Sequence, residues 1–265
     1  MSSTGCCPPG SLPALQGAED YEPKGTMTSM DVQAKDKVEK MEVYRVNVNG
    51  DGADPSIVLY YMYDVWGMKG TRARAMADTL SKVCNCEVVL PDLFLGDGCP
   101  SFEEMPAFVQ RACSWNLAKP RCEALLKDEQ RPVAFLGTCW GAYVGAWLTD
   151  GTACPTAFCQ VWWHPSVDAG NMDPAMKLTE AELVAKISVP TQVLAAELHD
   201  PQSLWPGGAV IESLTKTAPG SEGLPPAKNM AHGFSVRGDM NDEAVRVEVQ
   251  KAIDNLVRFV SKCKK

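Results

Sequence analysis

The stretch that decides the fold is residues 131–147, which read Arg-Pro-Val-Ala-Phe-Leu-Gly-Thr-Cys-Trp-Gly-Ala-Tyr-Val-Gly-Ala-Trp. An apolar run ends at Gly137, and a helical pattern of small residues begins directly after Trp140. This pattern predicts a buried strand, a tight turn and a helix. Inside the turn, Gly137-x-Cys139-x-Gly141 has the spacing of a nucleophile elbow in which a thiol replaces the usual hydroxyl.

An elbow of this type holds its nucleophile in a strained backbone conformation, and the flanking glycines let strand and helix approach closely. The helix that begins behind Cys139 would direct its free N–H groups at the sulfur, which favours a thiolate and a bound oxyanion. Alternatively, Cys139 is a buried structural cysteine, because a free thiol packs as a small hydrophobe. The spacing alone does not separate the two interpretations, since G-x-C-x-G also arises by chance.

Bulk properties restrict the class of protein. The 265 residues suit one α/β domain, and 45% apolar with 22% charged residues is ordinary for a globular chain. The net charge of -8 and the absence of basic runs argue against nucleic acid or an anionic membrane as partner. No apolar run approaches the ~20 residues that span a bilayer, and the N-terminus lacks the pattern of a secretory signal. We therefore expect a cytoplasmic protein.

The 11 cysteines are scattered along the chain and odd in number, which fits a reducing compartment better than a disulfide framework. Cys84-x-Cys86 and the pair Cys6-Cys7 each resemble half of a metal site. The chain has only three histidines, and no matching second half-site is visible in the sequence. We therefore expect neither a metal centre nor a cofactor.

The chain divides into two parts. Residues 1–40 are rich in Pro, Gly, Ser and charge, which predicts a surface arm on or near a single domain formed by residues 41–265. In that domain, hydrophobic periodicity predicts strands near 43–48, 56–63, 86–90, 131–137, 156–163, 190–196 and 225–230, and helices near 71–83, 102–112, 117–128, 142–147, 180–185, 203–214 and 243–262. Strands alternating with helices indicate the α/β class, with a mostly parallel central sheet and helices on both faces.

Three candidate catalytic residues fall at or beyond the carboxyl ends of predicted strands, where parallel sheets bind their ligands. They occur in the order Cys139, Asp200, His232, which is the nucleophile–acid–base order of hydrolases with this elbow. Asp200 would fix the tautomer of His232, which would manage the thiol proton. The alternatives are a solvated aspartate before a proline and a histidine in a surface turn.

A second group follows the strand at 56–63. We assign the two oxyanion donors to the backbone N–H groups of Val65 and Trp140. Asp64 lies at the mouth of the same site, where a carboxylate beside Cys139 would disfavour the thiolate until substrate displaces it. The alternative role for Asp64 is a turn or helix cap.

Several motifs together resemble the dienelactone hydrolase (carboxymethylenebutenolidase-like) family. They are Asp64-Val-Trp-Gly67, Pro91-Asp-Leu-Phe94, Gly137-Thr-Cys-Trp-Gly141, Asp200-Pro201 and His232-Gly-Phe234. Three further stretches resemble its eukaryotic, fungal-type branch: Cys6-Cys7-Pro-Pro-Gly-Ser11, Tyr21-x-Pro-Lys-Gly25 and Trp163-His-Pro-Ser166. The resemblance implies an α/β-hydrolase fold without a large lid domain, a Cys–His–Asp triad, and hydrolysis of an ester or lactone through an acyl-thioester.

The chain departs from the bacterial members of that family in its candidate substrate-binding residues. Asp64 stands where they carry a glutamate, and Val236 stands where they carry the arginine that binds the substrate carboxylate, with Arg237 one residue further on. Trp66 and Phe234 are candidates for an apolar pocket wall or for ordinary core packing. For His164, which replaces a small or aromatic residue, lining the pocket and hydrogen bonding in the core both remain open.

These observations lead to one main hypothesis and two alternatives. The main hypothesis is a cysteine-dependent hydrolase of dienelactone hydrolase type, acting on a small-molecule lactone or ester, as a monomer or homodimer. A thioesterase or acyl transferase is the nearest alternative, because an acyl-cysteine can pass its acyl group to acceptors other than water. From a different class comes a redox-sensing or binding protein whose exposed thiolate is oxidised but never turns over.

Overall fold

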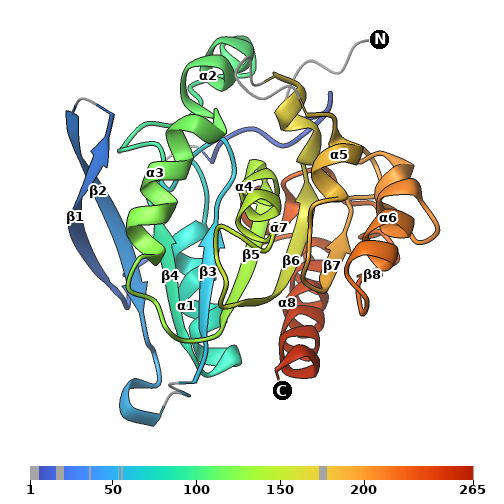
Figure 1. The fold of residues 1–265 in the computed structure, drawn as a ribbon. Coiled ribbons are helices and arrows are strands. Elements are labelled where there is room, and N and C mark those ends of the chain that lie inside the picture. The colour runs from blue at the N-terminus through green and yellow to red at the C-terminus, as the bar shows by residue number, and fades with distance from the viewer. Residues whose placement is uncertain are drawn as a thin grey trace.

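The computed structural model describes residues 6–15, 21–35, 37–52, 54, 56–172 and 178–264. Within these residues, eight strands form one sheet in the order β1-β2-β4-β3-β5-β6-β7-β8 (Figure 1). Pairing is parallel from β4 to β8 and antiparallel at β1–β2 and β2–β4. The strands are β1 (Thr26–Ala34), β2 (Lys37–Val46), β3 (Val58–Met62), β4 (Glu87–Pro91), β5 (Val133–Cys139), β6 (Ala157–Pro165), β7 (Thr191–Leu194) and β8 (Glu222–Gly223).

Helices cover both faces of this sheet, with α3 and α4 on one face and α1 and α8 on the other (Figure 1). The α-helices are α1 (Ala73–Cys84), α2 (Met105–Ala112), α3 (Trp115–Leu126), α4 (Trp140–Leu148), α5 (Glu180–Val184), α6 (Ala209–Thr217), α7 (Phe234–Arg237) and α8 (Glu243–Cys263). Short 3₁₀ helices lie at η1 (Gly50–Gly52), η2 (Val167–Met172) and η3 (Gln202–Leu204). The predicted α/β class, with a mostly parallel sheet between two helical layers, is confirmed. No helix in the described part of the chain is long and apolar enough to cross a membrane.

The N-terminal region differs from the prediction of an arm up to residue 40. Residues Thr26–Ala34 form the edge strand β1, which pairs along its whole length with β2. Nearly every side chain of β1 is exposed or half-buried, and the apolar alternation is confined to Met30, Val32 and Ala34. The strand expected at 43–48 is longer, belongs to β2 and lies one position inside the sheet edge. The arm proper is the described segment 6–15.

Two later elements also differ. The helix expected at 203–214 is split into η3 and α6, because Pro206, Gly207 and Gly208 interrupt the helical backbone. The short strand expected at 225–230 is reduced to one bridge between Ala196 and Ala227, and the last strand, β8, lies just before it. The other predicted strands and helices are present, with ends that differ by a few residues.

The core of the sheet is the pair β3–β5, whose residues are all buried. Helix α4 leaves β5 at Cys139 and folds back against both strands, so that its backbone almost touches that of β3. A Cβ atom on Gly141 would lie 1.9 Å from the carbonyl oxygen of Met62, and one on Gly137 would lie 2.6 Å from the backbone of Ala142. The two glycines of the elbow motif are therefore required by the close approach of strand and helix.

This approach makes Gly141→Ala strongly destabilising. We expect the variant to lose about 3 kcal/mol or more of unfolding free energy, because backbone and not a flexible side chain would have to move. Urea unfolding of the variant measures the loss. Gly52→Ala is the matched control, since its added Cβ would meet nothing within 4 Å, and it should unfold like the wild type. Equal stability of the two variants would contradict the packing described for α4.

Candidate active site

The sulfur of Cys139 is placed by a strained backbone. Cys139 is the last residue of β5 and precedes α4, with φ 51° and ψ −118°, in a region that residues other than glycine rarely adopt. In this conformation its side chain lies at the carboxyl edge of the sheet, beside the first turn of α4. The geometry is that of a nucleophile elbow.

His232 and Asp200 form a buried hydrogen-bonded pair at the same edge. The Nδ1 atom of His232 lies 2.6 Å from Oδ1 of Asp200, and the backbone N–H of Ala196 donates to the other carboxylate oxygen at 2.7 Å. Asp200 follows β7, and His232 lies just before α7, so two loops past neighbouring strand ends bring them together. Because Asp200 holds Nδ1, the imidazole presents Nε2 to its surroundings.

Cys139 lies next to this pair. The sulfurs of Cys7 and Cys139 and a ring nitrogen of His232 all lie within 4.8 Å of one another. Nε2 of His232 is buried and has no hydrogen-bond partner among the described residues, so this atom is free to exchange a proton with a thiol. Such contacts are often long in a structure without substrate.

The charges around Cys139 and His232 shift the pKa values of both groups. Burial alone would raise the pKa of Cys139, but hydrogen bonds from Cys6 and Cys7 and the imidazolium of His232 hold it well below its usual value. Burial alone would lower the pKa of His232, but Asp200 and Cys139 raise it well above its usual value. The favoured state is therefore a thiolate at Cys139 beside an imidazolium at His232.

The N-terminal arm covers the sulfur. The Cys6 and Cys7 sulfurs lie 3.5 Å and 3.6 Å from that of Cys139. The hydroxyl of Ser166 donates to the carbonyl oxygen of Cys6, and the N–H of Leu12 donates to the carbonyl oxygen of His232 at 3.0 Å. The expectation of an exposed thiolate is wrong for this conformation, because Cys139 is fully buried beneath the arm. In this conformation the sulfur is closed off from solvent.

Asp64, Arg237 and Trp66 form a second buried group. The Nε–H of Arg237 donates to one carboxylate oxygen of Asp64 at 2.9 Å. The backbone N–H of Trp66 donates to the other oxygen at 2.9 Å. The guanidinium lies 5.6 Å from the centre of the Trp66 ring. Both terminal nitrogens of Arg237 are buried without a partner among the described residues. The carboxylate of Asp64 is thus engaged by Arg237, and two charged donors remain unused.

The remaining candidates flank His232. The ring of His164 lies 5.0 Å from that of His232 and 5.7 Å from that of Phe234. Nε2 of His164 makes a 2.6 Å hydrogen bond with the hydroxyl of Ser235, as the core interpretation requires. Burial and the charge on His232 lower the pKa of His164 well below its usual value, so this imidazole stays neutral.

The two assigned oxyanion donors also lie in the interior. Trp140 opens α4 directly after Cys139, and its indole packs 4.5 Å from Phe94, ring centre to ring centre. Val65 follows β3, and its carbonyl oxygen accepts from Cys99 at 2.8 Å. Within the described part of the chain, neither backbone N–H donates to a protein acceptor. Both groups are therefore available to an oxygen atom of a ligand.

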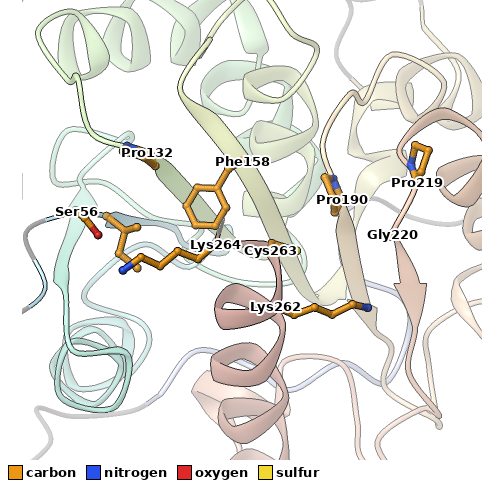
Figure 2. Close-up of a pocket in the computed structure, with 10 residues that line it drawn as sticks. Ser56, Pro132, Phe158, Pro190, Pro219, Gly220, Lys262, Cys263 and Lys264 are labelled. Carbon is orange, nitrogen blue, oxygen red and sulfur yellow. The ribbon is translucent and has the colours of Figure 1, made fainter.

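A separate pocket of about 560 Å³ opens at the opposite edge of the sheet (Figure 2). It lies around Pro132 and Pro190, which precede β5 and β7, and the side chains of Lys262 and Lys264 extend from the end of α8 beside it (Figure 2). Cys139 lies at the other end of β5. Ligands of parallel sheets bind at the carboxyl ends of the strands, so this pocket is not part of the candidate active site.

Three contacts of the site were missed in the sequence. The pair Cys6-Cys7 was considered as half of a metal site and as part of a family motif, and nothing local shows that it meets a sulfur more than 130 residues away. The ion pair between Asp64 and Arg237 joins residues that are 173 positions apart. Each of these residues stood in or beside a recognisable motif, but which residues contact one another depends on the tertiary fold.

Asp64 makes the stability depend on pH. Burial raises its pKa to about 6, although Arg237 opposes the shift, whereas an unfolded aspartate titrates near ~3.9. The stabilisation from this group is therefore fully present below about pH 4 and is lost as the pH rises through about 6. Urea unfolding should show the free energy of the wild type falling by about 3 kcal/mol relative to Asp64→Asn between pH 4 and pH 7. If the unfolding free energy of the wild type instead rises with pH relative to Asp64→Asn, the attraction of Arg237 for the carboxylate outweighs the effect of burial on the pKa of Asp64.

Comparison with solved structures places this arrangement in a known fold. No family model and no curated protein sequence matches the chain. A Klebsiella pneumoniae protein assigned as a dienelactone hydrolase superposes with a TM-score of 0.64 at 12% identity, covering 89% of this chain and 99% of its own. A dienelactone hydrolase-like promiscuous phosphotriesterase from metagenomic libraries gives 0.60 at 14% identity, with 91% and 99% covered. A Pyrococcus furiosus esterase gives 0.61 at 13% identity, with 94% and 98% covered. At these identities the likeness establishes the architecture, and the chain has the α/β-hydrolase fold.

Proposed function

We propose that this protein is a cysteine-dependent carboxylic ester hydrolase of dienelactone hydrolase type, acting on a small lactone or ester. The observation that carries the proposal is the buried His232–Asp200 hydrogen bond of 2.6 Å beside a cysteine on a nucleophile elbow. A nucleophile, a base and a group that orients the base are the minimum set for acyl transfer through a covalent intermediate. The names of the structural neighbours point to the same reaction class.

The reaction begins when the arm withdraws and an ester carbonyl meets the Cys139 sulfur. The thiolate adds to the carbonyl carbon, and the N–H groups of Val65 and Trp140 stabilise the negative oxygen. His232 protonates the departing alkoxide, which leaves an acyl-thioester on Cys139. His232 then removes a proton from water, the hydroxide attacks the thioester, and the acid product leaves the thiolate restored. Asp200 keeps Nδ1 protonated and stabilises the imidazolium throughout.

Arg237 would select substrates that carry an acidic group. Its terminal nitrogens are buried and unpartnered, and a carboxylate is the ligand that matches a guanidinium fork. Asp64 holds the guanidinium through Nε and leaves those nitrogens unused. Arg237 would thus serve in place of the family arginine, whose position is occupied by Val236.

A redox-sensing thiol is the second candidate, favoured by the two sulfurs within 3.6 Å of Cys139. A peroxide would oxidise the Cys139 thiolate to a sulfenic acid and leave as hydroxide or alcohol. The thiol of Cys6 or Cys7 would then displace water from the sulfenic acid and form a disulfide with Cys139.

The triad predicts the effect of three substitutions on the hydrolysis of a chromogenic short-chain ester. Cys139→Ala and His232→Ala should abolish turnover, and Asp200→Asn should lower kcat by about 10²- to 10⁴-fold, because the imidazole loses its tautomer. Cys154→Ala, at a buried cysteine near the opposite end of β5 from the elbow, is the control and should hydrolyse like the wild type. The wild type should also show the mass of an acyl adduct on Cys139.

If all of these variants hydrolyse the ester alike, the triad is not the catalyst. If no ester turns over, while a peroxide removes two hydrogen masses and links Cys139 to residue 6 or 7, the redox candidate replaces the hydrolase.

The role of Arg237 predicts a split between substrates. In Asp64→Asn/Arg237→Gln, which removes both partners and leaves no buried charge unpaired, kcat/KM for a carboxylate-bearing lactone should fall by about 10- to 100-fold. A neutral lactone of the same size should be hydrolysed at the wild-type rate. Steady-state kinetics on the two lactones measures the split. An equal loss on both substrates would assign Arg237 a structural role only.

A further inference from the structure

The proposed hydrolysis uses one sulfur of a group that contains three. Cys6 and Cys7 contact Cys139 at 3.5 Å and 3.6 Å, and all three side chains are buried. The sulfurs of Cys7 and Cys139 also share the neighbourhood of a His232 ring nitrogen, with no pair of these three atoms more than 4.8 Å apart. In the proposed hydrolysis neither Cys6 nor Cys7 bonds to the substrate, and their only contribution is the hydrogen bonds that lower the pKa of Cys139.

The spacing of these atoms suits a tetrahedral metal. Zinc binds thiolate sulfur at about 2.3 Å and imidazole nitrogen at about 2.0–2.1 Å, so two sulfurs on one zinc lie roughly 3.8 Å apart. The observed distance of 3.6 Å between Cys7 and Cys139 is close to that value. Thiolates and an imidazole are soft ligands that favour zinc over magnesium or calcium, which need oxygen ligands.

The imidazole is also oriented for a metal. Asp200 accepts the Nδ1 proton of His232, which leaves Nε2 as the donor atom on the side of the sulfurs. Metal-bound histidines are commonly held by a carboxylate in this way, which raises their basicity. Nε2 of His232 is buried, so a metal ion bound there would be shielded from water.

We propose that Cys7, Cys139 and His232 form a three-ligand binding site for a thiophilic divalent cation of the zinc type. In the sequence Cys7 lacks a second half-site, and the fold supplies one from the elbow and the loop before α7. Binding replaces the protons on Cys7 and His232, so two protons leave as one dication enters. The bound ion would fix the N-terminal arm over the elbow.

A second consequence rests on the proposed hydrolase function. An ion held by Cys139 and His232 occupies both the nucleophile and the base, so zinc would inhibit hydrolysis reversibly. Withdrawal of the ion by a chelator would restore activity without any change in the covalent structure.

Cobalt(II) is the probe of the site itself, because its thiolate charge-transfer and tetrahedral ligand-field bands report the ligands directly. The full-length chain, reduced and freed of metal with a chelator, should bind one cobalt ion per chain with these bands, and zinc should displace it. Competition against a chromophoric zinc indicator should give a Kd below about 1 µM.

Four variants test the assignment of ligands. Cys7→Ala should weaken zinc binding by at least ~100-fold, and Cys139→Ala should weaken it at least as much. Asp200→Asn removes no ligand and should weaken binding by about 10- to 100-fold. Cys154→Ala is the matched control, since Cys154 and Cys7 are both 4% exposed, and it should bind zinc like the wild type.

Absence of the thiolate bands, or equal zinc affinity in the Cys7→Ala and Cys154→Ala variants, would overturn the site. Urea unfolding of each metal-free variant checks that it is folded. If Cys7→Ala is not folded, the zinc affinity of Asp200→Asn decides the test. The two proposals fail separately. Zinc binding without ester hydrolysis would contradict only the hydrolase, and hydrolysis insensitive to zinc, with no cobalt bands, would contradict only the metal site.

Discussion

The candidate site depends on the close approach of helix α4 to strand β3 behind Cys139. Two glycines allow this approach, because a side chain at Gly141 would overlap the backbone of Met62. The turn between strand and helix forces Cys139 to a positive φ and thereby places its sulfur above the end of β5. Without that turn the thiol would be one more buried cysteine beside the eight others that the structure buries.

Burial then determines the electrostatics. In water, the proton stays on the thiol, because the ordinary thiol pKa exceeds that of an imidazole by about two units. Here Asp200 stabilises a charged His232 inside the protein, which favours transfer of the proton to the imidazole. The same burial makes every unpaired group expensive, which is why Asp64 and Arg237 pair and why the free nitrogens of Arg237 point to a ligand. The arm completes the exclusion of water, since Cys6 and Cys7 occupy the position that a substrate would need.

Local patterns predicted most of the fold, and they singled out Cys139, Asp200 and His232, which the structure brings together. The spacing Gly137-x-Cys139-x-Gly141 could be recognised from five residues, because the backbone of the turn requires glycine at both flanking positions. The buried strands could be recognised as apolar runs. Strand β1 was missed because most of its side chains are exposed or half-buried, and its place in the sheet depends on pairing with β2 and packing against α3. The contact of Cys6 and Cys7 with the elbow was missed because these residues are more than 130 positions from Cys139 in the sequence. No local pattern indicates which distant thiol a cysteine contacts.

The central claim is that Cys139 is a thiolate held by an imidazolium at neutral pH. Its most direct measurement is the ultraviolet absorbance of the thiolate, taken as the difference between the metal-free wild type and the Cys139→Ala variant across a pH titration. The claim predicts one thiolate per chain well below the ordinary thiol pKa of about 8.5, and its loss from neutral solution when His232 is replaced by alanine. A band that appears only in alkaline solution, or that is indifferent to His232, would contradict it.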